Sequence, residues 1–587
     1  MNGDRNPEHA VGLLMGRKKD SAFLPCAHEV FRSSSSLKTE PTLHLGRQRV
    51  FVAAALLIVF CKSLVAAASV VSEESSASLS QESSASLSEV CVPLRAATVR
   101  LVCGTDFSSG VIVTGEGHIL SVSHGLPKDL RSATVVFFDG VTADADILLR
   151  DPNADVAVLK LKSVAPARDL KPVSTGPFGQ PVKGLNVIAA GYPGREKSGF
   201  SPVMRLGELL AAEATVLRSS CTLTAGDSGG PLIDLSGRLI GLHRQIGLGA
   251  ESNHHIPIER IVEVIKPLLD LSDSSQRQPV INPGTSALPR QLPVVGDAVT
   301  KTCRQRTVEI FQGENQEGRV LGTLLNQEWV VTKLSELTPE VPVLCRFHDG
   351  SQSSCTIRKS TVALDMCLLK LEMPREGVAP LESTGTDETG LLYSPMVAST
   401  GTAGVLRFGL LTRVQHAEPV LVGKLGAVLE IDDVVKVVRV KDVAPNSTAG
   451  IARLQTGDQI LAVNQQSIGR LDDVGAALNK RQPGDWLSIQ FERDTTRQSA
   501  FARFQHDPGE RFERTEFLDG RSGRVSERRS GFEDVFQHDA ALRPNQCGGP
   551  LCDLSGRIIA INIARRARES TLAIPLNQVL TELQSEP

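Results

Sequence analysis

The chain contains two copies of one sequence pattern, and this repetition constrains its architecture more than any other feature. An aspartate followed by apolar residues at 155–161 returns at 365–371, and a Gly-Gly-Pro-Leu segment at 229–232 returns at 548–551. The matching segments, in chain order, are 139–140 with 349–350, 155–161 with 365–371, and 229–238 with 548–557. Because matches that keep one order are not expected by chance, we interpret the chain as a duplicated folding unit.

The first copy carries a serine inside a glycine-rich turn. Residues 224–232 read Thr-Ala-Gly-Asp-Ser-Gly-Gly-Pro-Leu. The glycines let backbone N–H groups converge on one point beside Ser228, where acyl transfer places negative charge on a tetrahedral intermediate. We therefore expect Ser228 to be a nucleophile and the N–H groups of Gly226 and Ser228 to form an oxyanion hole. A tight glycine turn without chemistry is the alternative.

A histidine and an aspartate stand upstream of this serine. His124 ends an apolar, β-rich run that begins at Gly117, and Asp155 opens a buried strand. His124 would act as general base, and Asp155 would hold its tautomer and stabilise the imidazolium. Taken alone, such a histidine is more often a structural or surface residue, and such an aspartate a strand cap. The order His, Asp, Ser, at a spacing that two six-stranded barrels require, favours catalysis.

These three segments resemble the trypsin-like serine proteases, and more narrowly the HtrA/Deg group of bacterial envelope proteases. The resemblance covers roughly residues 91–270 and implies a chymotrypsin-like double β-barrel. One residue departs from the group, which usually has Asn where this chain has Asp227. In secreted trypsins that aspartate pairs with a newly cut N-terminus, but no Ile-Val-Gly-Gly-like start lies near Cys91. Either another group neutralises Asp227 or its carboxylate is solvated.

The resemblance also places a primary specificity pocket. Thr222 and the segment 241–247, with Gly241 and His243, would line it. Neither part carries an acidic group at the base of the pocket, so a basic P1 residue is not expected. We expect a small or aliphatic P1 residue.

The second copy has lost most of this chemistry. Cys547 stands at the serine position, and the histidine position falls on Leu334 or Ser335, depending on a one-residue gap. Only Asp365 is kept. A thiol without a histidine to deprotonate it is a poor nucleophile, so we expect a pseudoprotease. The alternative is a functional Cys547.

The second copy also contains an insert. Its aspartate and nucleophile positions, 365 and 547, are more than twice as far apart as 155 and 228 in the first copy. We therefore place extra residues between its two barrels. Within them, Leu-Gln-Thr-Gly-Asp-Gln-Ile-Leu-Ala-Val-Asn at 454–464 resembles a PDZ domain.

Such domains bind a C-terminal carboxylate on backbone N–H groups and add the peptide as a strand. The resemblance gives the carboxylate loop as Lys424, Leu425, Gly426 and Ala427. An ordinary small β-domain is the alternative.

One apolar segment has targeting character. Two arginines precede the apolar run 50–60, and small residues follow it. This pattern is typical of a secretory signal, cleaved near Ala68, and predicts a periplasmic or secreted protein. A membrane anchor at 50–71 is the alternative, although the run is short and Lys62 interrupts it.

Composition narrows the remaining possibilities. Glycine is abundant and long helical periodicity is scarce, which favours an all-β fold, and 41 % hydrophobic residues suffice for real cores. A net charge of −3 implies no attraction to nucleic acid. No CxxC pair of zinc type is present, so we expect neither metal nor cofactor. In an exported protein, Cys345 with Cys355 and Cys91 with Cys103 are candidate disulfides.

The predicted organisation is all-β, with two double barrels, the second degenerate, and a small α+β PDZ domain. The segments are an N-terminal extension with signal peptide or anchor (1–68), a Ser-rich spacer (69–90), a protease domain (91–271), a linker (272–298), a degenerate first barrel (299–420), the PDZ domain (421–495) and a degenerate second barrel (496–587).

These features predict a secreted or periplasmic serine endopeptidase of the HtrA type. We expect it to cleave unfolded or damaged proteins through an acyl-enzyme, while the PDZ domain binds substrates or C-terminal peptides. The alternative is a non-catalytic, PDZ-bearing quality-control or scaffold protein that binds unfolded chains. The sequence is compatible with a membrane tether and with a homo-oligomer.

Overall fold

The computed structural model describes residues 87–584 with internal gaps. The gaps are 164–168, 176–180, 195–200, 248–252, 270–291, 293–294, 314–319, 383–387, 433, 480 and 507–523. The proposed signal segment, most of the spacer and most of the linker therefore lie outside the described residues. Among the helices that are described, none is long and apolar enough to cross a membrane.

Two closed six-stranded barrels form the first half. The first barrel contains β1 (Thr98–Cys103), β2 (Asp106–Ile112), β3 (His118–Ser121), β4 (Ser132–Val136), β5 (Thr142–Asp151) and β6 (Val156–Leu161). The second contains β7 (Asn186–Gly191), β8 (Val203–Ala212), β9 (Leu217–Ser219), β10 (Pro231–Asp234), β11 (Leu239–Gln245) and β12 (Asn253–Pro257). Helix α2 (Ile258–Leu269) follows β12.

The strands follow from runs of branched apolar residues that face the barrel interiors. Leu101, Ile119 and Leu159 lie in the core of the first barrel, and Val187 and Leu232 lie in that of the second. A further buried cluster draws on strands of both barrels, including Leu120, Ile188 and Leu242. This packing fixes the barrels against each other and so positions the loops that carry the candidate site.

Two more closed barrels form the second half. The third barrel contains β13 (Thr307–Gln312), β14 (Val320–Leu324), β15 (Trp329–Lys333), β16 (Val343–Arg346), β17 (Gln352–Thr361) and β18 (Met366–Leu371). The fourth contains β19 (Pro395–Ala398), β20 (Arg407–His416), β29 (Val535–His538), β30 (Pro550–Asp553), β31 (Ile558–Ala567) and β32 (Ser570–Pro575). Helices α3 (Asp297–Arg306) and α7 (Leu576–Gln584) flank these strands in the sequence.

The strand orders of the two halves match, which confirms the predicted duplication. The first barrel runs β1-β2-β3-β6-β5-β4 and the third runs β13-β14-β15-β18-β17-β16. The second and fourth barrels share one cyclic order too, with β19 and β20 in the places of β7 and β8. The all-β, double-barrel fold class is therefore confirmed.

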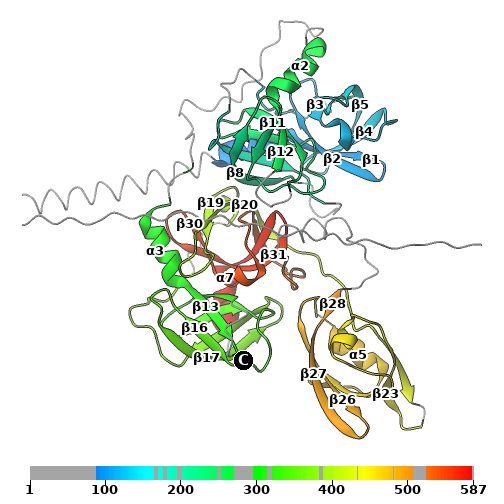
Figure 1. Cartoon of the computed structure of the whole chain (residues 1–587), viewed down its shortest axis with the longest axis vertical. Coiled ribbons are helices and arrows are strands. Elements are labelled where there is room, and N and C mark those ends of the chain that lie inside the picture. The colour runs from blue at the N-terminus through cyan, green and yellow to red at the C-terminus, as the bar shows by residue number, and fades with distance from the viewer. Residues whose placement is uncertain are drawn as a thin grey trace, which may run out of the picture. The chain divides into compact units, whose positions relative to one another are not determined.

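The position of the insert differs from the prediction. We expected it between the barrels of the second copy, but it lies inside the fourth barrel, between β20 and β29. Backbone pairing decides this, because β19 pairs with β30, and β20 pairs with β29 beyond the insert. In Figure 1 this barrel brings β19 and β20 together with β30 and β31, which are far apart in the sequence. Sequence spacing bounded the insert only between Asp365 and Cys547, an interval too wide to locate it.

The described part of the inserted domain contains a six-stranded PDZ-like sheet, a separate two-stranded sheet of β21 and β28, and two helices. Its strands are β21 (Gly423–Lys424), β22 (Ala427–Asp432), β23 (Val437–Val443), β24 (Gln459–Val463), β25 (Gln466–Ser467), β26 (Trp486–Arg493), β27 (Thr496–Arg503) and β28 (Gln505–His506). The helices are α4 (Thr448–Ile451) and α5 (Leu471–Leu478). The sheet continues past residue 495, the predicted end of the domain, because β27 pairs with β26 along its whole length.

No described cysteine forms a disulfide, although two cysteine pairs lie close together. The Sγ atoms of Cys345 and Cys355 lie 3.3 Å apart on the β16–β17 hairpin. Cys91 and Cys103 belong to different buried clusters and do not meet. Spacing did not suggest a third pair, Cys303 on α3 and Cys552 on β30, whose Sγ atoms lie 2.7 Å apart. All described cysteines are free thiols and buried.

Candidate active site

His124, Asp155 and Ser228 converge between the first two barrels. A single 3-10 turn, η1 (Ser123–Gly125), presents His124 directly after β3, and Asp155 immediately precedes β6. His124 Nδ1 lies 2.8 Å from Asp155 Oδ2, and its Nε2 lies 3.1 Å from Ser228 Oγ. The side chain of His124 is 47 % exposed and that of Asp155 only 10 %, so the imidazole faces solvent and the carboxylate lies buried behind it. These contacts give a base the reach it needs to take a proton from the serine.

Asp155 is held by its backbone as well as by the histidine. Its φ of 59° is unusual for a residue with a side chain, and its Oδ1 accepts the backbone N–H of His124 at 3.0 Å. Burial raises the pKa of Asp155, but hydrogen bonds from His124 and the charges of His124 and Arg244 outweigh it, so the pKa lies below its usual value. Asp155 therefore stays ionised and orients the imidazole.

Arg244 is a contact that sequence reasoning missed. Its Nε lies 3.4 Å from Asp155 Oδ2, and its side chain is 44 % exposed. No motif marks it, although it directly follows His243 on β11. A cation here adds to the charge that keeps Asp155 ionised.

Glycines shape the loop that carries Ser228. A Cβ on Gly226, whose φ is 100°, would come within 2.4 Å of the carbonyl oxygen of Tyr192. One on Gly229, whose φ is 86°, would lie 2.3 Å from the carbonyl oxygen of Ser109. Among the described residues, the N–H groups of Gly226 and Ser228 donate to no other protein group. Two such donors beside one hydroxyl can stabilise an oxyanion.

The predicted specificity residues lie deeper than expected. His243 is fully buried, and its ring nitrogens contact His255 at 3.0 Å and the carbonyl oxygen of Ala190 at 3.1 Å. Its imidazole therefore packs inside the second barrel and offers no surface to a substrate. A Cβ on Gly241 would meet the carbonyl oxygen of Ile256 at 2.7 Å, so this glycine serves strand packing. Thr222 is also buried.

The second half identifies the residue at the histidine position. In the first half, the Ser123 N–H donates to the carbonyl oxygen of Asp155, and the His124 N–H donates to its carboxylate. In the second half, the Leu334 N–H donates to the carbonyl oxygen of Asp365, and the Ser335 N–H donates to its carboxylate. Ser335 is thus the counterpart of His124, which resolves the alternative with Leu334.

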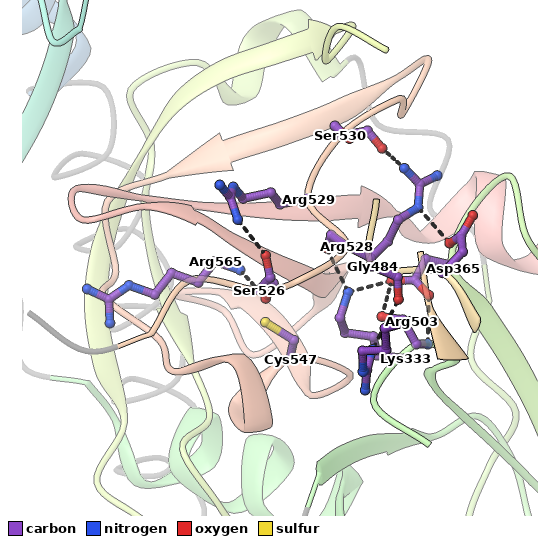
Figure 2. Close-up of polar contacts among 12 residues, drawn as sticks. Lys333, Asp365, Gly484, Arg503, Ser526, Arg528, Arg529, Ser530, Cys547 and Arg565 are labelled. Atoms are coloured by element: carbon purple, nitrogen blue, oxygen red, sulfur yellow. Dashed lines mark hydrogen bonds and ion pairs between the residues drawn. The ribbon is translucent and has the colours of Figure 1, made fainter. Parts of the chain in front are cut away.

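A lysine takes the place of the imidazole at the second carboxylate. The Lys333 ammonium binds Asp365 Oδ2 and donates to the carbonyl oxygen of Arg528 at 3.0 Å, while Ser335 Oγ donates to Asp365 Oδ2 at 2.8 Å. The side chain of Lys333 is 0 % exposed. Figure 2 shows Lys333, Asp365 and Arg528 in one cluster beside Cys547.

Cys547 sits in this cluster as a buried thiol. Burial raises its pKa to about 11, although the charge of Lys333 acts against the rise. Ser526 exchanges two hydrogen bonds with the backbone of Arg565 on β31, and Figure 2 shows it next to the thiol. A protonated, enclosed sulfur with a serine at the base position does not support nucleophilic chemistry.

The predicted carboxylate loop of the inserted domain precedes an edge strand. Among the described residues β22 pairs only with β23, so its second edge has no strand partner. Gly426 has a φ of 71°, and a Cβ there would lie 2.2 Å from Ser447 Cβ. Leu425 is buried in the core, the carbonyl of Lys424 accepts a hydrogen bond from Thr448, and Ala427 begins β22.

Comparisons with known proteins agree with this architecture. A family model described as a trypsin-like peptidase domain matches residues 108–242, and a PDZ domain model matches residues 411–502. A relative from Brucella suis biovar 1 (strain 1330), named probable periplasmic serine endoprotease DegP-like, is 23 % identical over 410 residues, covering 67 % of this chain and 72 % of the relative.

Two other relatives match shorter stretches. Protease Do-like 1, chloroplastic, from Arabidopsis thaliana is 30 % identical over 175 residues, covering 27 % of this chain and 39 % of the relative. Serine protease PepD from Mycobacterium tuberculosis is 31 % identical over 169 residues, covering 25 % and 36 %. The chain therefore contains a trypsin-like peptidase domain and a PDZ domain, and it is similar to DegP-like serine endoproteases.

Proposed function

We propose that the chain is an exported endopeptidase that cleaves unfolded or damaged proteins through an acyl-enzyme, with Ser228 as nucleophile, His124 as general base and Asp155 as its orienting carboxylate. The observation that carries the proposal is the continuous set of contacts from Asp155 through the imidazole to the Ser228 hydroxyl, at 2.8 and 3.1 Å. The names of the DegP-like relatives support export to the cell envelope.

The chemistry follows from these positions. Ser228 Oγ bonds to the scissile carbonyl carbon while its proton passes to His124 Nε2. The N–H groups of Gly226 and Ser228 hold the negative oxygen of the intermediate. Its collapse breaks the C–N bond, and the imidazolium gives its proton to the leaving amine. Water then attacks the ester by the same route and frees Ser228.

The PDZ domain would supply a second contact with the substrate. The unpaired edge of β22 can take an added strand, and the loop from Lys424 to Ala427 stands at the strand's start. Val428 and Leu471 are exposed apolar side chains on β22 and α5. A chain end bound there raises the local concentration of substrate at the peptidase domain.

Covalent labelling tests the catalytic part of the proposal. A serine-directed fluorophosphonate should label the wild type but not Ser228→Ala, and before labelling only the wild type should digest a permanently unfolded model substrate. No labelling and no digestion by the folded wild type would favour the non-catalytic scaffold instead. Equal digestion of a stably folded protein of similar size would overturn the proposed substrate class.

Peptide competition tests the PDZ part. A peptide with a free C-terminus should slow digestion of long substrates and leave cleavage of short chromogenic peptides unchanged, and the same peptide with an amidated end is the matched control. Activation of short-peptide cleavage would contradict tethering and indicate allosteric coupling.

A further inference from the structure

A buried ion pair lies directly beneath the nucleophile. Asp227 immediately precedes Ser228, and its Oδ1 lies 3.0 Å from Arg205 Nη1 on β8. Both side chains are 1 % exposed. The sequence left open whether another group neutralises this carboxylate or whether it is solvated, and the structure shows that Arg205 neutralises it.

Asp227 occupies a closely fitted slot in the loop. Its Oδ2 accepts the backbone N–H of Thr224 at 2.8 Å, and its carbonyl oxygen accepts that of Gly230 at 2.9 Å. A Cβ on Gly191, at the end of β7, would lie 2.5 Å from Asp227 Oδ1, so only a glycine there leaves room for the carboxylate. The side chain of Asp227 thus holds the turn in which the N–H groups of Gly226 and Ser228 lie.

We propose that Arg205 is a positioning residue for acyl transfer: by neutralising Asp227 inside the barrel, it keeps the Gly226 and Ser228 N–H groups aimed at the oxyanion. This inference rests on the proposed function. In this proposal Arg205 supplies the positive charge that neutralises Asp227, so a newly cut N-terminus is not needed for that purpose.

The physical reason is the cost of burying an unpaired charge. Burial raises the pKa of Asp227, and Arg205 acts against that rise. Glu569, which follows β31, adds a like charge that raises the pKa further. The buried imidazole of His243 stays neutral because burial lowers its pKa. Without Arg205, Asp227 must either take up a proton or leave its slot, and leaving would turn the two N–H groups away.

The test uses Arg205→Met, Asp227→Asn and the double variant, with a short chromogenic peptide and rates normalised to folded protein. Arg205→Met should lower kcat by about 10²- to 10³-fold, as the loss of oxyanion stabilisation does, with little change in KM. Its kcat should fall as pH rises and Asp227 loses its proton, while that of the wild type shows no such fall. The double variant has no charge to bury at position 227, so it should recover much of kcat and lose the fall with rising pH.

Arg528→Met is the matched control. Arg528 is equally buried, at 1 % exposure, and pairs with Asp485 in the second half. Its loss should destabilise the fold but leave kcat and the pH profile of folded protein unchanged. If Arg205→Met folds poorly, Arg205→Lys keeps the charge and should retain the wild-type pH profile.

Two results would overturn the inference. One is that Arg205→Met alters only the yield of folded protein, with kcat and pH profile intact, and the other is that the double variant is no better than the single ones. If the wild type itself neither labels nor hydrolyses, the proposed function fails instead, so the two failures are distinguishable.

Discussion

The two halves keep the same aspartate in the same turn but give it different partners. Asp155 and Asp365 have φ values of 59° and 53°, and each carboxylate accepts the backbone N–H of the residue at the histidine position, at 3.0 and 2.8 Å. This aspartate therefore caps a turn whether or not catalysis follows. Its presence in a half without a catalytic histidine has a structural explanation.

The two halves differ in the side chain that binds the aspartate carboxylate. Asp155 holds a half-exposed imidazole that reaches Ser228, whereas Asp365 holds the buried ammonium of Lys333. The ammonium in turn binds the backbone of Arg528, whose guanidinium pairs with Asp485 of the PDZ domain. The same barrels thus support an open site in one half and an enclosed ionic network in the other.

Alanine substitutions at the two nucleophile positions should differ most in their effect on kcat. Ser228→Ala should lower kcat by about 10⁴- to 10⁶-fold, because the members of such a site act as a unit. Cys547→Ala should leave the rate almost unchanged, because the buried thiol has no base. Peptide hydrolysis by both variants measures this, and the opposite result would mean that the active half is misassigned.

The paired aspartates sharpen the comparison. Asp155→Asn should lower kcat by roughly 10⁴-fold, since an amide does not stabilise the required imidazole tautomer. Asp365→Asn should leave kcat unchanged but destabilise the second half by about 3–5 kcal/mol, because it strands the buried Lys333 charge. Kinetics and thermal unfolding of both variants separate the two roles. A catalytic defect in folded Asp365→Asn would contradict a purely structural network.

The enclosed network should also show in the pH dependence of stability. Burial raises the pKa of Asp485 to about 6, with Arg528 acting against the rise. In the unfolded chain an aspartate ionises near a pKa of about 3.9, so between these values the folded state binds more protons and its stability falls as pH rises.

In the wild type, the thermal-unfolding midpoint should decrease as pH rises from about 4 to about 6, because the slope of stability against pH follows the difference in bound protons. Asp485→Asn should abolish this decrease. Asp472→Asn, on a side chain of the same domain that is 89 % exposed, is the control. An unchanged slope in Asp485→Asn would show that this residue does not cause the pH dependence of stability.

The smallest effect should come from the contact at the rim of the open site. Arg244 lies 3.4 Å from Asp155 but is 44 % exposed. Exposed ion pairs contribute about 0–1 kcal/mol, so Arg244→Ala should lower kcat by no more than about fivefold, and less at high salt. A loss as large as that of Asp155→Asn would make Arg244 part of the catalytic set.

The sequence alone determined the features that are written in local patterns. The order of His124, Asp155 and Ser228, the repeated segments and the Leu-x-x-Gly-Asp motif of the insert each lie in a short run of residues. Such runs predicted the double barrels and the PDZ domain, because strand periodicity and turn glycines act over a few positions.

Only the tertiary structure decided the features that depend on residues far apart in the chain. Backbone pairing located the insert inside the fourth barrel and made Ser335 the counterpart of His124. Burial turned His243 into a core residue. The pairs Arg205–Asp227 and Lys333–Asp365 join positions on different strands and loops, with no spacing rule to reveal them. Whether a charge is neutralised depends on which strand folds against it, and that is a property of the assembled barrel.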